Sequence, residues 1–261
     1  HPQHHRTELD AASIPNLDRL ARDSAAGLTI PVSVGITPGS GPGHLALFGY
    51  DPLKYLIGRG ILEATGIEME LKRGDVAARG NLAQIDQQGL LIDRRAGRIN
   101  SEIASKLSEK LDSIKIPEVS VTVAHVKDYR FVLRLRGNKL SDKLTETDPQ
   151  KTGLPALPVT ARQNEAKGTA HIANEFVDQA KQILKDDQAN TVLLRGWSQL
   201  PLLPSLADSY QLTPAAIAAY PMYRGLAQLA GMKVIPTGLS FSEEVATLKS
   251  NYDKHDFFYI H

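Results

Sequence analysis

Ser40 lies in a segment whose residue types could support nucleophilic chemistry. The segment 35–44, GITPGSGPGH, contains four glycines and two prolines, and Ser40 stands between Gly39 and Gly41. A serine that follows an extended segment and precedes a helix has its hydroxyl exposed at a helix N-terminus, where free N–H groups and the helix dipole favour an anion. The alternative interpretation is an ordinary glycine-rich turn.

The segment matches neither of two familiar glycine-rich motifs. It is not a P-loop, because no lysine follows the last glycine in the required place. It is not a G-x-S-x-G nucleophile elbow either, because Pro38 and Pro42 occupy the two glycine positions.

Arginines at turns and strand ends are the second chemical signal. A guanidinium group binds phosphate or carboxylate through two parallel hydrogen bonds, so several of them around one cleft would suit a small, doubly anionic substrate. The alternative for any single arginine is a solvated surface, which we expect for Arg134 and Arg136. The candidates are Arg59, Arg79, Arg94, Arg95, Arg98, Arg130 and Arg195.

Composition excludes several classes of site and partner. The chain has no cysteine, which rules out disulfides, thiolate metal sites and a cysteine nucleophile. Its eight histidines show no close metal-ligand spacing; His4 and His5 are expected to be exposed, and His125 to face a cleft at the end of a strand. A net charge of +1 argues against a nucleic-acid or membrane-surface partner. With no signal-like or membrane-spanning apolar run, we expect a soluble cytoplasmic protein.

Hydrophobic periodicity predicts an α/β fold that is interrupted by a segment with an α+β pattern. The first part, 1–74, contains a helix that opens at Pro15 with a stop at Gly27, an extended segment over 28–34 and a helix from about residue 45. The middle part, 75–190, is an α+β segment with a hairpin around 86–89. The last part, 191–261, returns to alternating strands and helices, which favours a mostly parallel sheet with helices on both faces. Such a sheet binds ligands outside the carboxyl ends of its strands, where Arg195 and His261 are placed.

The individual elements of the last two parts follow from local patterns. We expect helices near 103–111, 170–185, 222–231 and 242–250, and strands at 119–125, 130–136, 191–195, 215–220, 233–236 and 256–261, with a helix as the alternative for 215–220. Within 130–136, Phe131, Leu133 and Leu135 share one face.

Nine motifs follow one another along nearly the whole chain: IPNLDRLA, TPGSGPGHLALFGYDP, GRGILEATG, GDVAARGN, DRRAGRI, LSDKLTETDP, NTVLLRG, LAQLAGMKVI and DFFYIH. Together they resemble the archaeal-type, cofactor-independent phosphoglycerate mutases of the alkaline-phosphatase superfamily.

The resemblance implies a phosphatase-like α/β core with an inserted substrate-binding domain, and interconversion of 3-phosphoglycerate and 2-phosphoglycerate. Ser40 would take the phosphoryl group and bind metal, and His44 would close the same motif. The metals would be two divalent ions, usually Mn²⁺ with Mg²⁺, Co²⁺ or Zn²⁺ as alternatives, and no 2,3-bisphosphoglycerate would be needed. The substrate-binding set would be His44, Arg59, Arg79, Arg94, Arg95, His125, Arg130 and Arg195.

The family's other metal motifs would lie before His1 and after His261, so we expect the chain to be a fragment of a longer enzyme. Two other functions stay open on the sequence. One is a different metal-dependent phosphatase or phosphomutase of the same superfamily. The other is a non-catalytic module that binds a phosphorylated metabolite.

Overall fold

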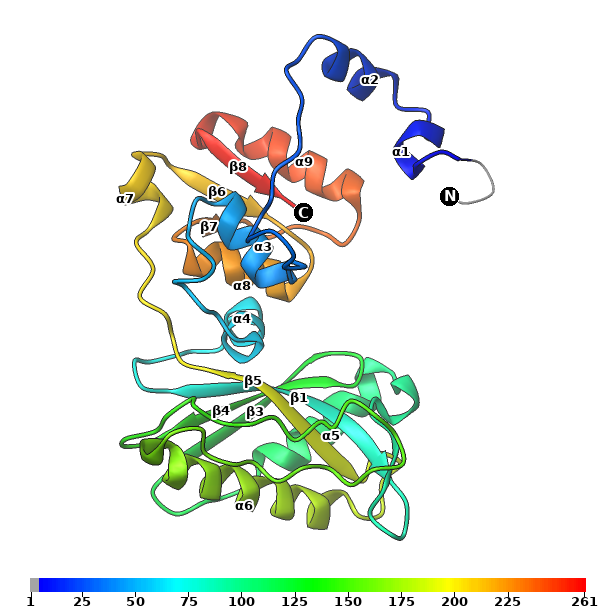
Figure 1. Cartoon of the computed structure of the whole chain (residues 1–261), viewed down its shortest axis with the longest axis vertical. Coiled ribbons are helices and arrows are strands. Elements are labelled where there is room, and N and C mark those ends of the chain that lie inside the picture. Colours follow the sequence, from blue (N-terminus) through cyan, green and yellow to red (C-terminus); the bar gives the residue numbers. More distant parts are fainter. Residues whose placement is uncertain (1–4) are drawn as a thin grey trace.

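Two sheets organise the chain in a computed structural model that describes residues 5–261 (Figure 1). Residues 1–4, which include His4 and begin the first predicted part, lie outside the described residues. The larger sheet has five strands and the smaller has three, and helix α4 (Arg59–Gly66) lies between them. The mixed α/β class predicted from the sequence is confirmed.

The larger sheet is antiparallel throughout. Its order is β2-β1-β4-β3, and β5 pairs with β1. The predicted hairpin is confirmed as β1 and β2, and β3 and β4 occupy the predicted segments. The strands are β1 (Val76–Ile85), β2 (Leu91–Asp93), β3 (Ser120–Lys127), β4 (Arg130–Arg136) and β5 (Thr191–Ser198).

Strand β5 corrects one prediction. The segment 191–195 was expected in the parallel sheet, but β5 pairs antiparallel with β1, with Gly80 opposite Leu194 and Leu82 opposite Val192. An apolar run indicates a buried strand without specifying its partner. The antiparallel sheet therefore continues past the expected boundary near residue 190, as far as Ser198.

Helices α5 (Ser101–Asp112) and α6 (Lys167–Leu184) pack on one face of this sheet. Alternate residues of β4, among them Phe131 and Leu133, are fully buried against this layer, as is Phe176 of α6. The period of two along the strand puts these side chains on one face, as the sequence predicts. Two short 3-10 turns, η1 (Ala96–Arg98) and η2 (Asn164–Ala166), complete the layer's connections.

Helix α4 covers the opposite face of the antiparallel sheet. Its Ile61 and Ala64 pack on Ala77 of β1 and Val132 of β4. The Ser198 hydroxyl of β5 accepts a hydrogen bond from the Ile61 N–H at 3.1 Å, and so satisfies a donor in the first turn of α4. Sequence patterns did not predict this helix.

The smaller sheet is parallel, with order β7-β6-β8 and helices on both faces. Ala216 packs toward α3 and α8, whereas Ile217 packs toward α9. The elements of this part are α3 (Ser40–Leu47), α7 (Leu206–Tyr210), β6 (Pro214–Ile217), α8 (Pro221–Leu229), β7 (Lys233–Val234), α9 (Phe241–Asn251), η3 (Tyr252–Lys254) and β8 (Phe257–Ile260). The three strands, α8 and α9 lie in segments that the sequence predicts, although β6 ends at Ile217 and not at residue 220. Helix α3 begins at Ser40, before the expected start near residue 45, and α7 and η3 were not predicted.

The N-terminal part corrects two further expectations. Helix α2 (Pro15–Arg22) starts at the predicted proline but ends before Gly27, and the expected strand over 28–34 is not formed. Neither α1 (Glu8–Ala11) nor α2 has a buried residue, and both stand apart from the two sheets (Figure 1). Within residues 5–261, no helix has the length and apolar character needed to cross a bilayer.

A buried ion network ties the loop after β4 to the sheet. Both carboxylate oxygens of Asp148, whose side chain is fully buried, accept hydrogen bonds from Arg94 at 2.7 Å. Arg195 lies 3.7 Å from the same carboxylate. Beside it, Thr147 exchanges backbone and side-chain hydrogen bonds with Leu194, which covers the outer edge of β5.

The contact of α4 with β1 leaves no room for a side chain at Gly60. A Cβ there would overlap the backbone of Ala77, so we expect Gly60→Ala to lower the free energy of unfolding by about 1–3 kcal/mol. Gly168→Ala, in α6 with open space around it, is the matched control and should raise stability by about 0.5–1 kcal/mol. Denaturant unfolding measures both, and equal effects would contradict the close α4–β1 contact.

Asp148→Asn tests the ion network. Burial acts to raise the pKa of Asp148, but hydrogen bonds from Arg94 and Gln150 and the charges of Arg94 and Arg195 bring it below its usual value. A carboxyl group whose pKa is lower in the folded state contributes stability at pH values above its unfolded-state pKa, which is near 4. This contribution is lost as the pH falls through the folded-state pKa. We expect a loss of about 2 kcal/mol at pH 7 that shrinks below about pH 4.

Unfolding curves from pH 3 to 8 provide the measurement. Glu102→Gln, which removes an exposed pair with Lys106, is the control and should change little at any pH. A stability loss in Asp148→Asn that does not depend on pH would rule out the charge of Asp148 as the cause.

Candidate active site

Ser40 is the first residue of α3 and is exposed. Gly39 is the N-cap and supplies no side-chain hydrogen bond, so the backbone N–H groups of Ser40 and Gly41 stay available to a ligand, whereas Pro42 has no N–H group to offer. Gly41 is close to the Leu62 side chain of α4, where a Cβ would lie 3.2 Å from Leu62 Cδ1. This location agrees with the expected placement of Ser40; its role as nucleophile stays a prediction.

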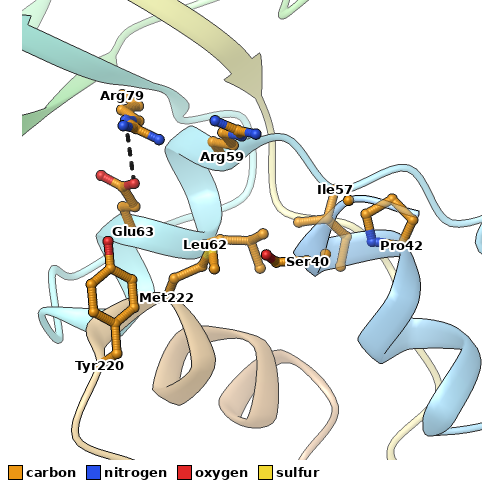
Figure 2. A pocket seen from close by; sticks show the side chains of 11 residues that line it. Ser40, Pro42, Ile57, Arg59, Leu62, Glu63, Arg79, Tyr220 and Met222 are labelled. Carbon is orange, nitrogen blue, oxygen red and sulfur yellow. Dashed lines mark ion pairs between the residues drawn. The ribbon is translucent and has the colours of Figure 1, made fainter. Parts of the chain in front are cut away.

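A pocket of about 400 Å³ opens beside Ser40. Figure 2 shows its two sides, with Ser40 and Pro42 on α3 at one end and Glu63, Arg79 and Tyr220 at the other. The lining residues come from α3 and its N-cap, from α4, β1 and α8, and from the residues just before α4 and α8. They are Gly39, Ser40, Gly41, Pro42, Ile57, Arg59, Leu62, Glu63, Arg79, Tyr220 and Met222.

Strand register places several predicted arginines on the sheet face that carries α4. Arg79 of β1 lies opposite Val132 of β4 and opposite Arg195 of β5. Arg130 of β4 lies opposite Asn81, two residues along β1 from Arg79, and therefore projects from the same face. Arg79, Arg130 and Arg195 thus form a row of cations, which we call the arginine row.

Glu63 and Arg79 form an ion pair in the pocket wall, with Arg79 Nε 3.4 Å from Glu63 Oε1 (Figure 2). The side chain of Glu63 is 1% exposed and that of Arg79 is 13% exposed. Burial raises the pKa of Glu63, against the opposing charges of Arg79, Arg130 and Arg59. Burial likewise lowers the pKa of Arg79. An arginine still stays protonated in such a site, so the wall carries positive charge.

Arg130 reaches the pocket through Tyr220. Its Nη1 donates a hydrogen bond to the Tyr220 hydroxyl, and its guanidinium carbon lies 5.7 Å from the Tyr220 ring centroid. Tyr220 follows β6, so the pocket lies near the carboxyl ends of the parallel strands, as expected for this kind of sheet.

Of the predicted substrate-binding residues, Arg59 and Arg79 line the pocket and Arg130 contacts its wall. Arg94 and Arg195 instead bind Asp148, and Arg195 also lies 3.6 Å from Glu146. The remaining predicted residues are His44, Arg95 and His125, which do not line this pocket in the described part of the chain. Their roles stay predictions.

His44 and His125 each have a structural partner. His44 Nδ1 donates to the Ser40 carbonyl oxygen at 2.6 Å, and its ring lies 4.9 Å from the Tyr223 ring and 5.6 Å from the His261 ring. His261 follows β8 at its carboxyl end, as predicted. His125 Nε2 donates to the Asp128 carbonyl oxygen at 2.8 Å. His44 is therefore positioned to fix the first turn of α3 around Ser40.

The expectation of a solvated face for Arg134 and Arg136 is wrong. Arg134 is only 9% exposed and donates to the Glu70 carbonyl and the Thr122 hydroxyl. Arg136 binds both carboxylate oxygens of Asp75. The segment that links α4 to β1 covers this part of β4, so the two arginines bind groups of the protein instead of facing solvent.

Sequence reasoning missed Glu63 and Tyr220. The position of Tyr220 just after a predicted parallel strand was a usable signal, because such positions collect at the ligand-binding edge. Glu63 gave no comparable signal, since it lies in the middle of a helix that the pattern did not predict.

The residues present do not make a complete divalent-metal site. Within residues 5–261, no group of three or more histidine, aspartate or glutamate side chains is arranged to hold a metal ion. Ser40 could contribute one oxygen ligand, which is too few for a site of the hydroxyl-activating kind.

Comparisons with known proteins agree on one family. A family model described as 2,3-bisphosphoglycerate-independent phosphoglycerate mutase matches residues 21–190. The probable enzyme of that name from Thermosipho melanesiensis is 51% identical over 258 residues, 98% of this chain and 64% of the relative. Its counterpart from Thermotoga maritima is 49% identical over 265 residues, 100% of this chain and 65% of the relative. This chain thus spans about two thirds of the length of these relatives.

A solved structure supports the same assignment. The cofactor-independent phosphoglycerate mutase from Thermoplasma acidophilum superposes with a TM-score of 0.69 at 30% identity, covering 98% of this chain and 71% of that one. Because the family model matches most of its length, the chain belongs to the 2,3-bisphosphoglycerate-independent phosphoglycerate mutase family.

Proposed function

We propose that this chain carries the phosphoryl-accepting serine and part of the substrate-binding surface of an enzyme that interconverts 3-phosphoglycerate and 2-phosphoglycerate. The observation that carries the proposal is that Ser40, at the start of α3, lines the same pocket as Arg59 and Arg79. A nucleophilic hydroxyl beside two guanidinium groups suits a substrate with one phosphate and one carboxylate.

The proposed reaction proceeds in two transfers. The Ser40 oxygen attacks phosphorus while the bond from phosphorus to glycerate O3 breaks, which gives phosphoserine and glycerate. Glycerate stays bound, turns, and attacks the phosphoserine through O2, which restores Ser40. Over the two transfers, O3 of glycerate gains one proton and O2 releases one. Ser40 loses its hydroxyl proton in the first transfer and regains one in the second. Arginines and the α3 N-terminus would hold the anionic groups in place, and exclusion of water would limit hydrolysis.

The architecture extends this proposal. We assign the parallel sheet with its helices to a phosphatase-like core, and the antiparallel sheet with α5 and α6 to the inserted substrate-binding domain. The family's description states independence from 2,3-bisphosphoglycerate. Two divalent metals, preferably manganese, and a cytoplasmic location are part of the proposal. Within residues 5–261, the side chains do not form a complete site for these metals.

Labelling tests the nucleophile. Complete, metal-loaded enzyme incubated with ³²P-labelled 3-phosphoglycerate should carry phosphoserine at residue 40. Ser40→Ala should lose at least about a thousandfold in turnover, because no oxygen remains to accept the phosphoryl group, while substrate affinity changes far less.

Ser101→Ala is the matched control, since Ser101 is also the first residue of a helix but does not line the pocket. It should keep both the label and turnover. Label on another residue, or near-normal turnover in Ser40→Ala, would refute the assignment.

A further inference from the structure

The pocket wall holds more positive than negative charge. Arg59 and Arg79 line it, and Arg130 touches it through Tyr220. Of the described residues that line the pocket, Glu63 is the single carboxylate. Three guanidinium groups near one small space repel each other, and the charges of Arg130 and Arg59 both act against protonation of Arg79.

The arginine row adds a second source of repulsion. Arg79 and Arg195 lie directly opposite each other on β1 and β5, an arrangement that destabilises a sheet when the charges are alike. Arg195 is balanced by Glu146 and Asp148. Arg79 is balanced by Glu63, which comes from α4 rather than from the sheet.

The Glu63–Arg79 pair is poorly built for stability alone. Neither carboxylate oxygen of Glu63 has a hydrogen-bond partner in the described chain, and Arg79 Nε has none either. Burying a charged group without hydrogen bonds is costly, and burial indeed raises the pKa of this carboxyl. By contrast, the Asp148–Arg94 pair has two hydrogen bonds of 2.7 Å. Hydrogen-bonding capacity left open in a pocket wall is a feature of binding sites.

We propose that Glu63 is a positioning residue whose carboxylate holds the Arg79 guanidinium at the pocket, where it binds an anionic group of the substrate. This inference rests on the proposed function. Without the carboxylate, repulsion from Arg59, Arg130 and Arg195 pushes the Arg79 side chain away, and substrate binding must then order it again. Preorganised side chains avoid that loss.

Glu63→Gln tests the role, because it removes the charge and keeps the size. In the complete enzyme we expect KM for 3-phosphoglycerate to rise roughly tenfold while kcat stays within about twofold, the split expected for lost binding. Calorimetric titration of 3-phosphoglycerate into Ser40→Ala and Ser40→Ala/Glu63→Gln should show the same roughly tenfold loss of affinity without turnover. Glu63→Asp, which keeps the charge, should lose less than Glu63→Gln.

A double-mutant cycle shows whether Glu63 acts through Arg79. In an Arg79→Gln background, Glu63→Gln should have almost no further effect on affinity. The control is Glu68→Gln, which removes an exposed ion pair with Arg224 next to the same helix and should leave KM unchanged.

The outcomes separate the two proposals. The positioning role is overturned if Glu63→Gln binds 3-phosphoglycerate as tightly as the wild type or more tightly. It is also overturned if Glu63→Gln lowers the affinity equally when Arg79 is already replaced. In both cases the proposed mutase activity still stands. Wild-type enzyme that neither binds nor converts 3-phosphoglycerate overturns the proposed function itself.

Discussion

The docking of α4 between the two sheets is the contact on which the pocket depends. The helix touches β1 at Gly60, where only a glycine allows the backbones to approach, and it meets α8 through Gly66 and Gly225 in the same way. Ser198 of β5 binds its first turn. Because these contacts fix the orientation and position of α4, the Glu63 side chain is buried in the pocket wall, and Arg59, which is exposed, lines the same pocket.

The same helix links the chemistry of the two sheets. Ser40 belongs to the layer that packs on the parallel sheet, whereas Arg79 and Arg130 belong to the antiparallel sheet. Carboxylates balance the arginines in two different ways. Asp148 binds Arg94 through two short hydrogen bonds and stabilises a loop, while Glu63 faces Arg79 without a hydrogen bond at the edge of a cavity. The second arrangement leaves Arg79 able to bind a ligand.

Local sequence patterns predicted most elements and the location of Ser40. The glycine- and proline-rich segment followed by LALF indicated the start of a helix. The alternation of apolar and polar residues along 130–136 indicated which residues of β4 share a face. The same patterns did not distinguish β5 from β6. Both strands are short apolar runs, but β5 belongs to the antiparallel sheet and β6 to the parallel sheet. They also could not separate Arg79 from Arg95. Both lie near glycines, yet Arg79 faces α4 and Arg95 is exposed.

By itself, the sequence determined the class of fold, the helix that carries Ser40, the absence of cysteine chemistry and the resemblance to the family. These features depend on hydrogen bonds and side-chain periodicity over a few neighbouring residues. Only the tertiary structure decided that Glu63 pairs with Arg79, that Asp148 is buried, and that Arg134 is covered. Each of those outcomes depends on strand register and on which distant segment excludes water from a charged group, and neither is encoded within one element.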